Sequence, residues 1–377
     1  MTEFKLNRRD FGVALAAGAA VAALPRLAMA DEAALPDTMI WTTYDVGSSS
    51  HTQASALADA FMKAYGTRIR LLPSGTAIGR LAPLLQAKAA FAFVATELYF
   101  ATRGLYDFGI EGWGPQPLRA VAGPPAAYGL VTTQESGIKT LADLKGKRFA
   151  YTEGNPSIAI KNDALLAAAG LTRDDVQIIS FPGYTPSLKA LIEGRADVAG
   201  ALTTSSPLYE LEASARGIAW IQLDPNNADI WSSVDKVAPM FGPIAEIAGA
   251  GIDPAKPVNL LGLRSPIICT TADQDENTVY NFAKALDEQH ENYKDAMSTM
   301  HRWKLDLSAV PPIDAPYHNG VVRYLTEKGI WTEKHQAWND KQVATLEALT
   351  AAWAELADLK GDPLAEAWIK KRDAILG

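Results

Sequence analysis

The sequence contains little that could form a metal centre or a covalent cross-link. Cys269 is the only cysteine among 377 residues, which excludes an intramolecular disulfide. The five histidines are scattered, and no pair of cysteines or histidines has the short spacing of a zinc site. Because Cys269 stands in the apolar stretch PIICTT, we interpret it as a buried core thiol. We therefore predict neither a metal site nor a cofactor.

The chain also lacks an excess of basic residues and an apolar run of membrane length. Its formal net charge of −8 argues against nucleic acid as a partner. The apolar run FGVALAAGAAVAAL near the N-terminus is shorter than the roughly 20 residues that a membrane-spanning helix needs. We therefore expect a soluble protein, and we expect it to be a monomer.

The N-terminal segment has the pattern of an export signal. Arg8 and Arg9 precede the apolar run, and small residues at 28 and 30 close it. We predict that residues 1–30 are a signal peptide, that cleavage follows Ala30, and that the mature protein is periplasmic. The arginine pair followed by Phe11 favours the twin-arginine route, with the general secretory route as the alternative.

Beyond residue 30, strand-like and helix-like segments alternate in two similar series. The first series has strands at 40–46, 68–72 and 91–94 and helices at 53–65 and 78–88. The second series has strands at 148–151, 176–180 and 196–201 and helices at 157–169 and 186–193. This order predicts an α/β protein with two lobes, each an open, mostly parallel sheet with helices on both faces.

A short internal similarity supports two lobes of like topology. The segments LAPLLQAKAAFAFVATEL (81–98) and LKALIEGRADVAGALTTS (188–205) both have a helix pattern, a tight turn and a buried strand pattern. Each strand ends in a threonine, Thr96 in the first segment and Thr203 in the second. Common helix-to-strand loop chemistry could also produce so short a match.

Small, hydroxyl-bearing residues follow most of the predicted strands. Ligands of open α/β sheets bind beyond the carboxyl ends of the strands, and helix N-termini attract anions. We therefore predict that the two lobes bind a small anion between them. The alternative for each hydroxyl residue is a helix cap. The candidate ligand-binding residues are Gly47, Ser48, Ser49, Ser74, Thr76, Arg80, Thr96, Glu97, Asn155, Ser157, Thr203 and Thr204.

Three cations stand near these segments: Arg80, Lys161 and Arg264. Any one of them could pair with a carboxylate of the ligand, and a bidentate arginine would bind it more strongly than a lysine. Glu97 could receive an amino group, which would favour an amino acid over a dicarboxylate.

The stretch YDVGSSSH also admits a catalytic interpretation, with Ser49 as a nucleophile and His51 as its base. The sequence has no Gly-x-Ser-x-Gly motif, and residues two apart at a helix start do not face each other. We therefore predict no catalytic residues and no enzyme, with a secreted serine hydrolase as the disfavoured alternative.

Two longer motifs carry a resemblance to a known family. They are LRAVAGPPAAYGLVTTQESGIKTLADLKGKR (118–148) and APYHNGVVRYLTEKGIW (315–331). From about residue 38 to residue 332 the chain resembles the TAXI family of TRAP-transporter receptors. The resemblance implies a fold like that of the type II periplasmic binding proteins, in which a hinge joins two lobes that close on the ligand. It also implies delivery of glutamate, glutamine or a small carboxylate such as 2-oxoglutarate to a TRAP membrane subunit of the fused type. A ligand sensor for a signalling partner is the alternative.

The expected domain organisation follows from the two series of elements and this resemblance. We expect the first part of lobe 1 at 31–127, lobe 2 at 128–264, and a return to lobe 1 with C-terminal helices at 265–377. The hinge strands are expected at 129–133 and 260–271. The apolar stripe of the segment QVATLEALTAAWAELADL predicts a helix packed on the back of a lobe, with a docking surface as the alternative.

Overall fold

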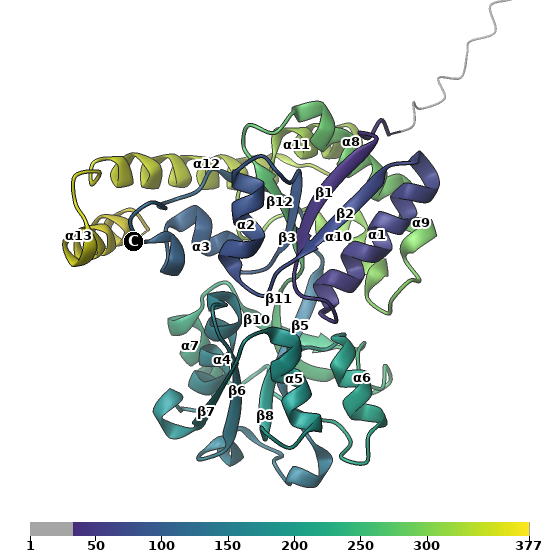
Figure 1. Ribbon diagram of the computed structural model, residues 1–377, viewed down its shortest axis with the longest axis vertical. Helices are drawn as coiled ribbons and strands as arrows, with labels where there is room; N and C mark the ends of the chain where they lie inside the picture. The colour runs from purple at the N-terminus through teal and green to yellow at the C-terminus, as the bar shows by residue number, and fades with distance from the viewer. Residues whose placement is uncertain (1–32, 377) are drawn as a thin grey trace, which may run out of the picture. The chain divides into compact units, whose positions relative to one another are not determined.

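The computed structural model describes residues 33–376, so the predicted signal peptide and its cleavage site lie outside the described residues. The described chain forms two mixed β-sheets (Figure 1), and we call each sheet with its helices a lobe. The first sheet has the order β2-β1-β3-β12-β4. Its strands are β1 (Thr38–Thr43), β2 (Arg68–Pro73), β3 (Phe91–Val94), β4 (Leu118–Ala122) and β12 (Ile267–Thr271).

The second sheet has the order β10-β11-β5-β8-β6-β7, and β9 pairs with β5 beside it. Its strands are β5 (Pro125–Thr132), β6 (Arg148–Thr152), β7 (Gln177–Phe181), β8 (Val198–Leu202), β9 (Ala219–Ile221), β10 (Gly242–Glu246) and β11 (Val258–Arg264).

The helices follow the same division. Those of the first lobe are α1 (Ser49–Tyr65), α2 (Ala77–Leu85), α3 (Glu97–Arg103), α8 (Glu276–Glu288), α9 (His290–Tyr293), α10 (Leu305–Ser308) and α11 (Asn319–Glu327). Those of the second lobe are α4 (Pro156–Ala168), α5 (Tyr184–Ile192), α6 (Ser206–Ala213) and α7 (Ala228–Val237). The short 3-10 helices are η1 (Tyr106–Phe108), η2 (Gln134–Ser136), η3 (Leu141–Leu144), η4 (Arg173–Asp175) and η5 (Met300–Trp303).

The two sheets share one arrangement, as the sequence predicted. In the first sheet β1 pairs in parallel with β2 and β3, and in the second β6 pairs in parallel with β7 and β8. Each sheet continues with an antiparallel strand from another part of the chain. In the first sheet β12 pairs with β3, and in the second sheet β5 pairs with β8. The similar segments 81–98 and 188–205 fall on α2–β3 and α5–β8. The predicted α/β fold class with two lobes of like topology is confirmed. The sheets are mixed, where mostly parallel sheets were predicted, because β12 and β5 add antiparallel strands.

The core of the first lobe is formed by the buried strand β3 and by aromatic side chains packed against it. All four residues of β3 are buried, as expected for a central strand covered on both faces. The ring of Phe282 in α8 stacks on Phe91 of β3 at 4.1 Å and meets Trp41 of β1 at 5.4 Å. This contact holds the chain beyond β12 against the first sheet.

The chain passes between the sheets twice, at residues 123–124 between β4 and β5 and at 265–266 between β11 and β12. The backbone N–H of Ser265 donates to the carbonyl of Pro124 over 3.1 Å, which ties the two crossings together. The prediction of a hinge strand at 129–133 was therefore wrong, because Gly129 lies inside β5 and pairs with Ala201 of β8. The crossing at 265–266 falls within the other predicted hinge range, 260–271.

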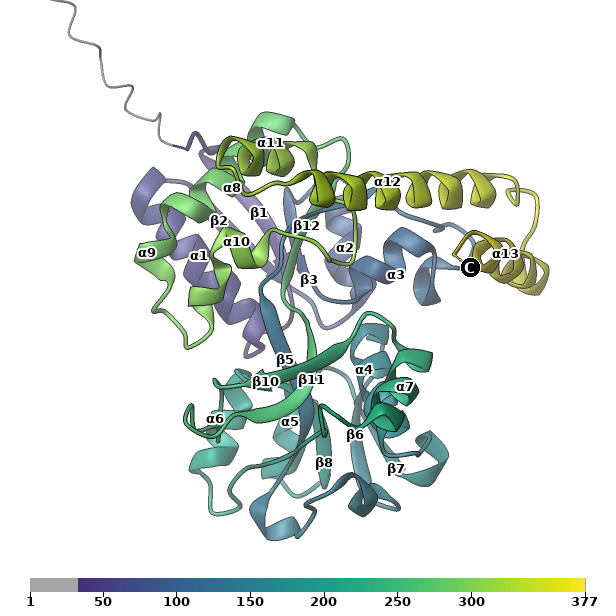
Figure 2. The same ribbon diagram turned by 180° about the vertical axis from the view of Figure 1, so that it is seen from behind.

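The C-terminal residues form two helices, α12 (Glu333–Ala354) and α13 (Gly361–Leu376). Figures 1 and 2 show them, in yellow, extending sideways from the first lobe past α3. The indole Nε1 of Trp368 donates to the carbonyl of Gly104 over 2.6 Å, and the Trp368 ring meets Trp353 at 5.0 Å. The apolar stripe of α12 is thus buried against α13 and the end of α3, where the prediction placed it on the back of a lobe. Within residues 33–376, no helix has the length and apolar character to cross a membrane.

Candidate functional site

A cavity lies where the carboxyl ends of the two sheets meet the N-termini of α1 and α4. It encloses about 340 Å³ of space between atoms, its open side included. Both lobes contribute to its wall, and we call it the central cavity. Its lining residues are Tyr44, Ser48, Ser50, Ala95, Tyr128, Ile158, Lys161, Tyr184, Leu202 and Ser265.

The N-terminus of α1 supplies donors to one side of this cavity. The Ser48 side chain caps the helix by accepting from the backbone N–H of His51 over 3.1 Å. The N–H groups of Ser49 and Ser50 stand in the first turn, where no helical partner exists. Ser50 is 2% exposed, and its buried hydroxyl has no hydrogen-bond partner among the described residues. A buried hydroxyl without a partner is costly, so this site favours a ligand that accepts hydrogen bonds.

Lys161 of α4 supplies a cation from the second lobe. Its ammonium donates to the carbonyl and the hydroxyl of Ser157, over 2.7 and 2.8 Å. An ammonium has three N–H groups, so one donor remains for another partner. Burial lowers the pKa of Lys161 to about 8, while the Glu97 carboxylate acts in the opposite sense. The side chain is therefore charged at neutral pH, and a bound anion would stabilise that charge.

Three tyrosine rings form part of the apolar wall, because the hydroxyl of each ring is hydrogen-bonded to another residue. The hydroxyl of Tyr44 donates to Glu97 Oε2 over 2.9 Å, and that of Tyr128 donates to Asn162 Oδ1 over 2.8 Å. The hydroxyl of Tyr184 lies 3.0 Å from Ser205 Oγ and accepts from the N–H of Leu202. Sequence reasoning missed these tyrosines. The one local signal was position, since Tyr44 directly follows β1 and Tyr184 begins α5.

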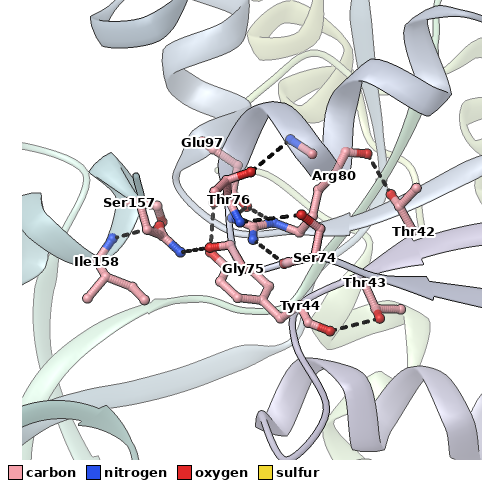
Figure 3. A network of polar contacts seen from close by, with 12 residues as sticks. Thr42, Thr43, Tyr44, Ser74, Gly75, Thr76, Arg80, Glu97, Ser157 and Ile158 are labelled. Carbon is pink, nitrogen blue, oxygen red and sulfur yellow. Dashed lines mark hydrogen bonds and ion pairs between the residues drawn. The ribbon is translucent and has the colours of Figure 1, made fainter. Parts of the chain in front are cut away.

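Arg80 and Glu97 form a fully buried ion pair behind Tyr44 (Figure 3). Arg80 Nε donates to Glu97 Oε1 over 2.8 Å, and its Nη1 donates to the carbonyl of Ser74 over 2.8 Å. The guanidinium also lies over the Tyr44 ring, 3.6 Å from its centre. Burial alone would raise the pKa of Glu97, but the charges of Arg80 and Lys161 outweigh it and lower that pKa. The pair positions Tyr44 and does not line the central cavity.

A second polar cavity, which we call the side cavity, adjoins the first and shares Leu202 and Ser265 with it. The hydroxyls of Ser49 and Thr204 meet there across the lobes, 2.6 Å apart, and Thr203 also lines it. Arg302 of the first lobe pairs with Glu246 of the second, with Nη1 2.9 Å from Oε2. Both side chains are nearly buried, so this ion pair joins the lobes out of solvent.

The profile of the NMT1-like family matches residues 75–329, more than half of the chain. The chain belongs to the NMT1-like family. The matched residues include strands of both sheets, from β3 to β12.

Several solved structures are similar to this NMT1-like protein at low identity. A protein from Bordetella bronchiseptica RB50 is 16% identical with a TM-score of 0.46, over 80% of this chain and 91% of that one. The alkanesulfonate-binding protein SsuA from Xanthomonas axonopodis pv. citri, bound to MOPS, is 13% identical with a TM-score of 0.41, over 78% and 92%. The amino acid ABC transporter substrate-binding protein AbpA from Streptococcus pneumoniae, bound to L-arginine, is 12% identical with a TM-score of 0.42, over 70% and 96%. At these values the similarities do not indicate a ligand.

The predicted site residues of the NMT1-like protein fall into three groups. Four line cavities between the lobes: Ser48 the central cavity, and Ser49, Thr203 and Thr204 the side cavity. Thr96 lines another, wider cavity. The remaining residues support these walls or join the lobes, and line none of the three cavities: Gly47, Ser74, Thr76, Arg80, Glu97, Asn155 and Ser157.

Several of these supporting residues connect the two lobes directly. The carbonyl of Gly47 accepts from the N–H of Ser206 over 3.1 Å. Asn155 caps α4 and donates through Nδ2 to the carbonyl of Gly75 over 3.3 Å. Thr76 caps α2, as the alternative interpretation of the hydroxyl residues anticipated.

Of the three candidate cations, only Lys161 lines the central cavity. Arg80 is engaged with Glu97, and Arg264 donates to the backbone carbonyls of Gly123 and Val310. Both arginines therefore serve internal partners in this conformation.

The geometry around His51 does not form a catalytic pair. Its ring Nδ1 lies 2.9 Å from the hydroxyl of Thr43, while Ser49 Oγ meets Thr204 and accepts from Gln53. Cys269 is buried in β12, and burial raises the pKa of its thiol, so it has the environment of a core residue. Among residues 33–376, no group of three His, Cys, Asp or Glu side chains is placed to hold a metal ion.

Proposed function

We propose that this NMT1-like protein is an extracytoplasmic, periplasmic receptor that captures a small organic anion between its lobes and takes no part in catalysis. One observation carries the proposal. Ser48 and Ser50 at the N-terminus of α1 in one lobe, and Lys161 of α4 in the other, line the same small cavity. Together they supply hydrogen-bond donors and a positive charge to a single anionic group.

The proposed mechanism is closure of the lobes on the solute. Since the donors come from both lobes, an anion in the central cavity gains its full set of contacts only when the lobes are together. It therefore stabilises the closed form by its differential affinity for that form. The side-cavity contacts Ser49–Thr204 and Arg302–Glu246 stabilise the same form.

The solutes that fit this chemistry are small carboxylates, such as glutamate, glutamine or 2-oxoglutarate. We propose that the receptor delivers its solute to a TRAP-type membrane transporter of the fused type, docking there as a monomer. Support for this partner comes from the resemblance carried by 118–148 and 315–331.

A thermal-shift titration of the protein that begins at Asp31 tests the proposal. A solute at ~100 times its dissociation constant adds about 2.7 kcal/mol to the free energy of unfolding. Lys161→Met should weaken binding by about tenfold or more, because it removes a charge-assisted hydrogen bond. Lys189→Met is the matched control, since Lys189 is exposed on the same lobe. The proposal fails if no small anion raises the melting temperature, or if the two variants lose affinity equally.

A further inference from the structure

The wider cavity that contains Thr96 has no role in the anion site described above. It encloses about 1000 Å³ of space between atoms, open side included, and we call it the distal cavity. The first lobe contributes Thr96, Tyr99, Ile313 and Asp314, and the second contributes Phe241 and Leu263 among others. Its wall is mostly apolar with a few polar groups, which is the usual composition of a small-molecule site.

Two charged side chains line the distal cavity, Arg264 and Asp314, and within residues 33–376 only the first has hydrogen-bond partners. The Arg264 guanidinium donates to the carbonyls of Gly123 and Val310, so it already serves the backbone. Asp314 is engaged only through its backbone carbonyl, which accepts from Arg103 Nη1 over 3.1 Å. Its side-chain carboxylate makes no hydrogen bond or ion pair with the described residues.

The Asp314 carboxylate is partly buried and lines a cavity, so a hydrogen-bond donor from a ligand would stabilise it. Burial raises the pKa of Asp314 to about 7, although the charges of Arg103 and Lys161 act to lower it. Leaving it unpaired costs free energy that a ligand ammonium, amidinium or amide N–H would recover.

The distal and central cavities lie next to each other. Ala95 lines the central cavity and the following residue, Thr96, lines the distal one. Ser265 also lines the central cavity, and the preceding residue, Arg264, lines the distal one. A solute anchored at Lys161 would pass these residues to reach Asp314.

We infer that the distal cavity binds the body of the solute, and that Asp314 pairs with a hydrogen-bond donor at its far end. The ligand class is then a small acid with an apolar spacer and a terminal cationic or N–H group. This inference rests on the proposed function only for the position of the solute's anionic group at Lys161.

Isothermal titration calorimetry with paired ligands tests the inference. Each pair is a straight-chain carboxylate and its ω-amino derivative, for example hexanoate and ω-aminohexanoate, taken over several chain lengths. At the best length the amino derivative should bind about tenfold more tightly. Asp314→Asn should abolish that preference, so that the plain carboxylate and the amino derivative of each pair bind with equal affinity. Asp306→Asn, at an exposed position of the same lobe, should keep the preference.

The outcomes separate this inference from the function on which it rests. If plain and amino acids bind equally at every length, the Asp314 subsite is refuted while the anion receptor stands. A preference that persists in Asp314→Asn also refutes the subsite. If neither series binds, the Asp314 subsite is refuted, and the anion receptor is then decided by the thermal-shift titration alone.

Discussion

Ser49 at the start of α1 and Thr204 after β8 meet across the two lobes, with their Oγ atoms 2.6 Å apart. Both side chains are buried, so the bond forms away from solvent. Since the residues belong to different lobes, the bond exists only while the lobes are together. This links a local hydrogen bond to the conformational equilibrium on which capture of a solute depends.

Thr204→Val should therefore weaken solute binding without changing the cavity wall that contacts the anion. The substitution keeps the shape of the side chain and leaves Ser49 bonded to Gln53. Loss of one buried hydrogen bond costs about 1 kcal/mol, or roughly a fivefold rise in the dissociation constant. Calorimetry measures this, and Thr345→Val on the surface of α12 is the control. Equal affinity in Thr204→Val and the wild type would contradict the prediction.

Arg80→Met should destabilise the fold strongly, because it leaves the Glu97 carboxylate buried without its ion pair. The expected loss is about 3–5 kcal/mol in the free energy of unfolding, measured by urea denaturation. The double variant Arg80→Met with Glu97→Leu should recover much of that loss, since no charge then remains unpaired. A double variant no more stable than the single one would show that the charge is not the cause.

The same pair predicts how the stability depends on pH. The pKa of Glu97 is lower in the folded protein than its ordinary value of 4.5. Its contribution is therefore present above that ordinary value and is lost as the pH falls through the lower, folded pKa. The urea concentration at the unfolding midpoint should be measured at decreasing acidic pH. It should fall more steeply for the wild type than for the double variant Arg80→Met with Glu97→Leu.

Solute binding should weaken as the pH rises above about 8, the pKa of the buried Lys161 ammonium. An anion raises that pKa in the complex, so affinity is full below pH 8 and declines as the pH rises through the pKa of the complex. Glu97, Asp314 and Arg80 also act on this group. Lys161→Met should bind weakly with no alkaline decline. If that decline persists in Lys161→Met, another group is responsible.

Trp368→Ala should loosen α13 without affecting the solute. Trp368 is 1% exposed, donates to the carbonyl of Gly104 and packs on Trp353. Truncation of a buried tryptophan costs about 3–5 kcal/mol locally. Limited proteolysis should cut between α12 and α13 much faster, while the dissociation constant stays the same. Ile369→Ala, at a half-exposed neighbour, should leave cleavage unchanged. A change in affinity for Trp368→Ala would contradict the separation of these helices from the site.

The sequence by itself determined the features that depend on residues close together in the chain, which are the helices, the strands and the helix caps. The alternation of strand-like and helix-like segments predicted the two β-α-β series, and the like segments that fall on α2–β3 and α5–β8 supported two lobes of like topology. The hydroxyl residues before α1 and α2 were recognised as candidate helix caps, and Ser48 and Thr76 cap them. Caps and periodicity are local, so a single sequence carries them.

Only the tertiary structure decided which side chains face the cavities. Tyr44, Tyr128 and Tyr184 line one cavity because the residue after β1, a residue inside β5 and the first residue of α5 converge there. Nothing in their local patterns differs from those of core residues. Arg80 and Glu97 were both candidate ligand contacts, yet packing brings them together, since a buried charge is stable only beside its opposite. The hinge was misplaced for the same reason, because strand pairing across the chain, which no local pattern specifies, decides where one sheet ends and the next begins.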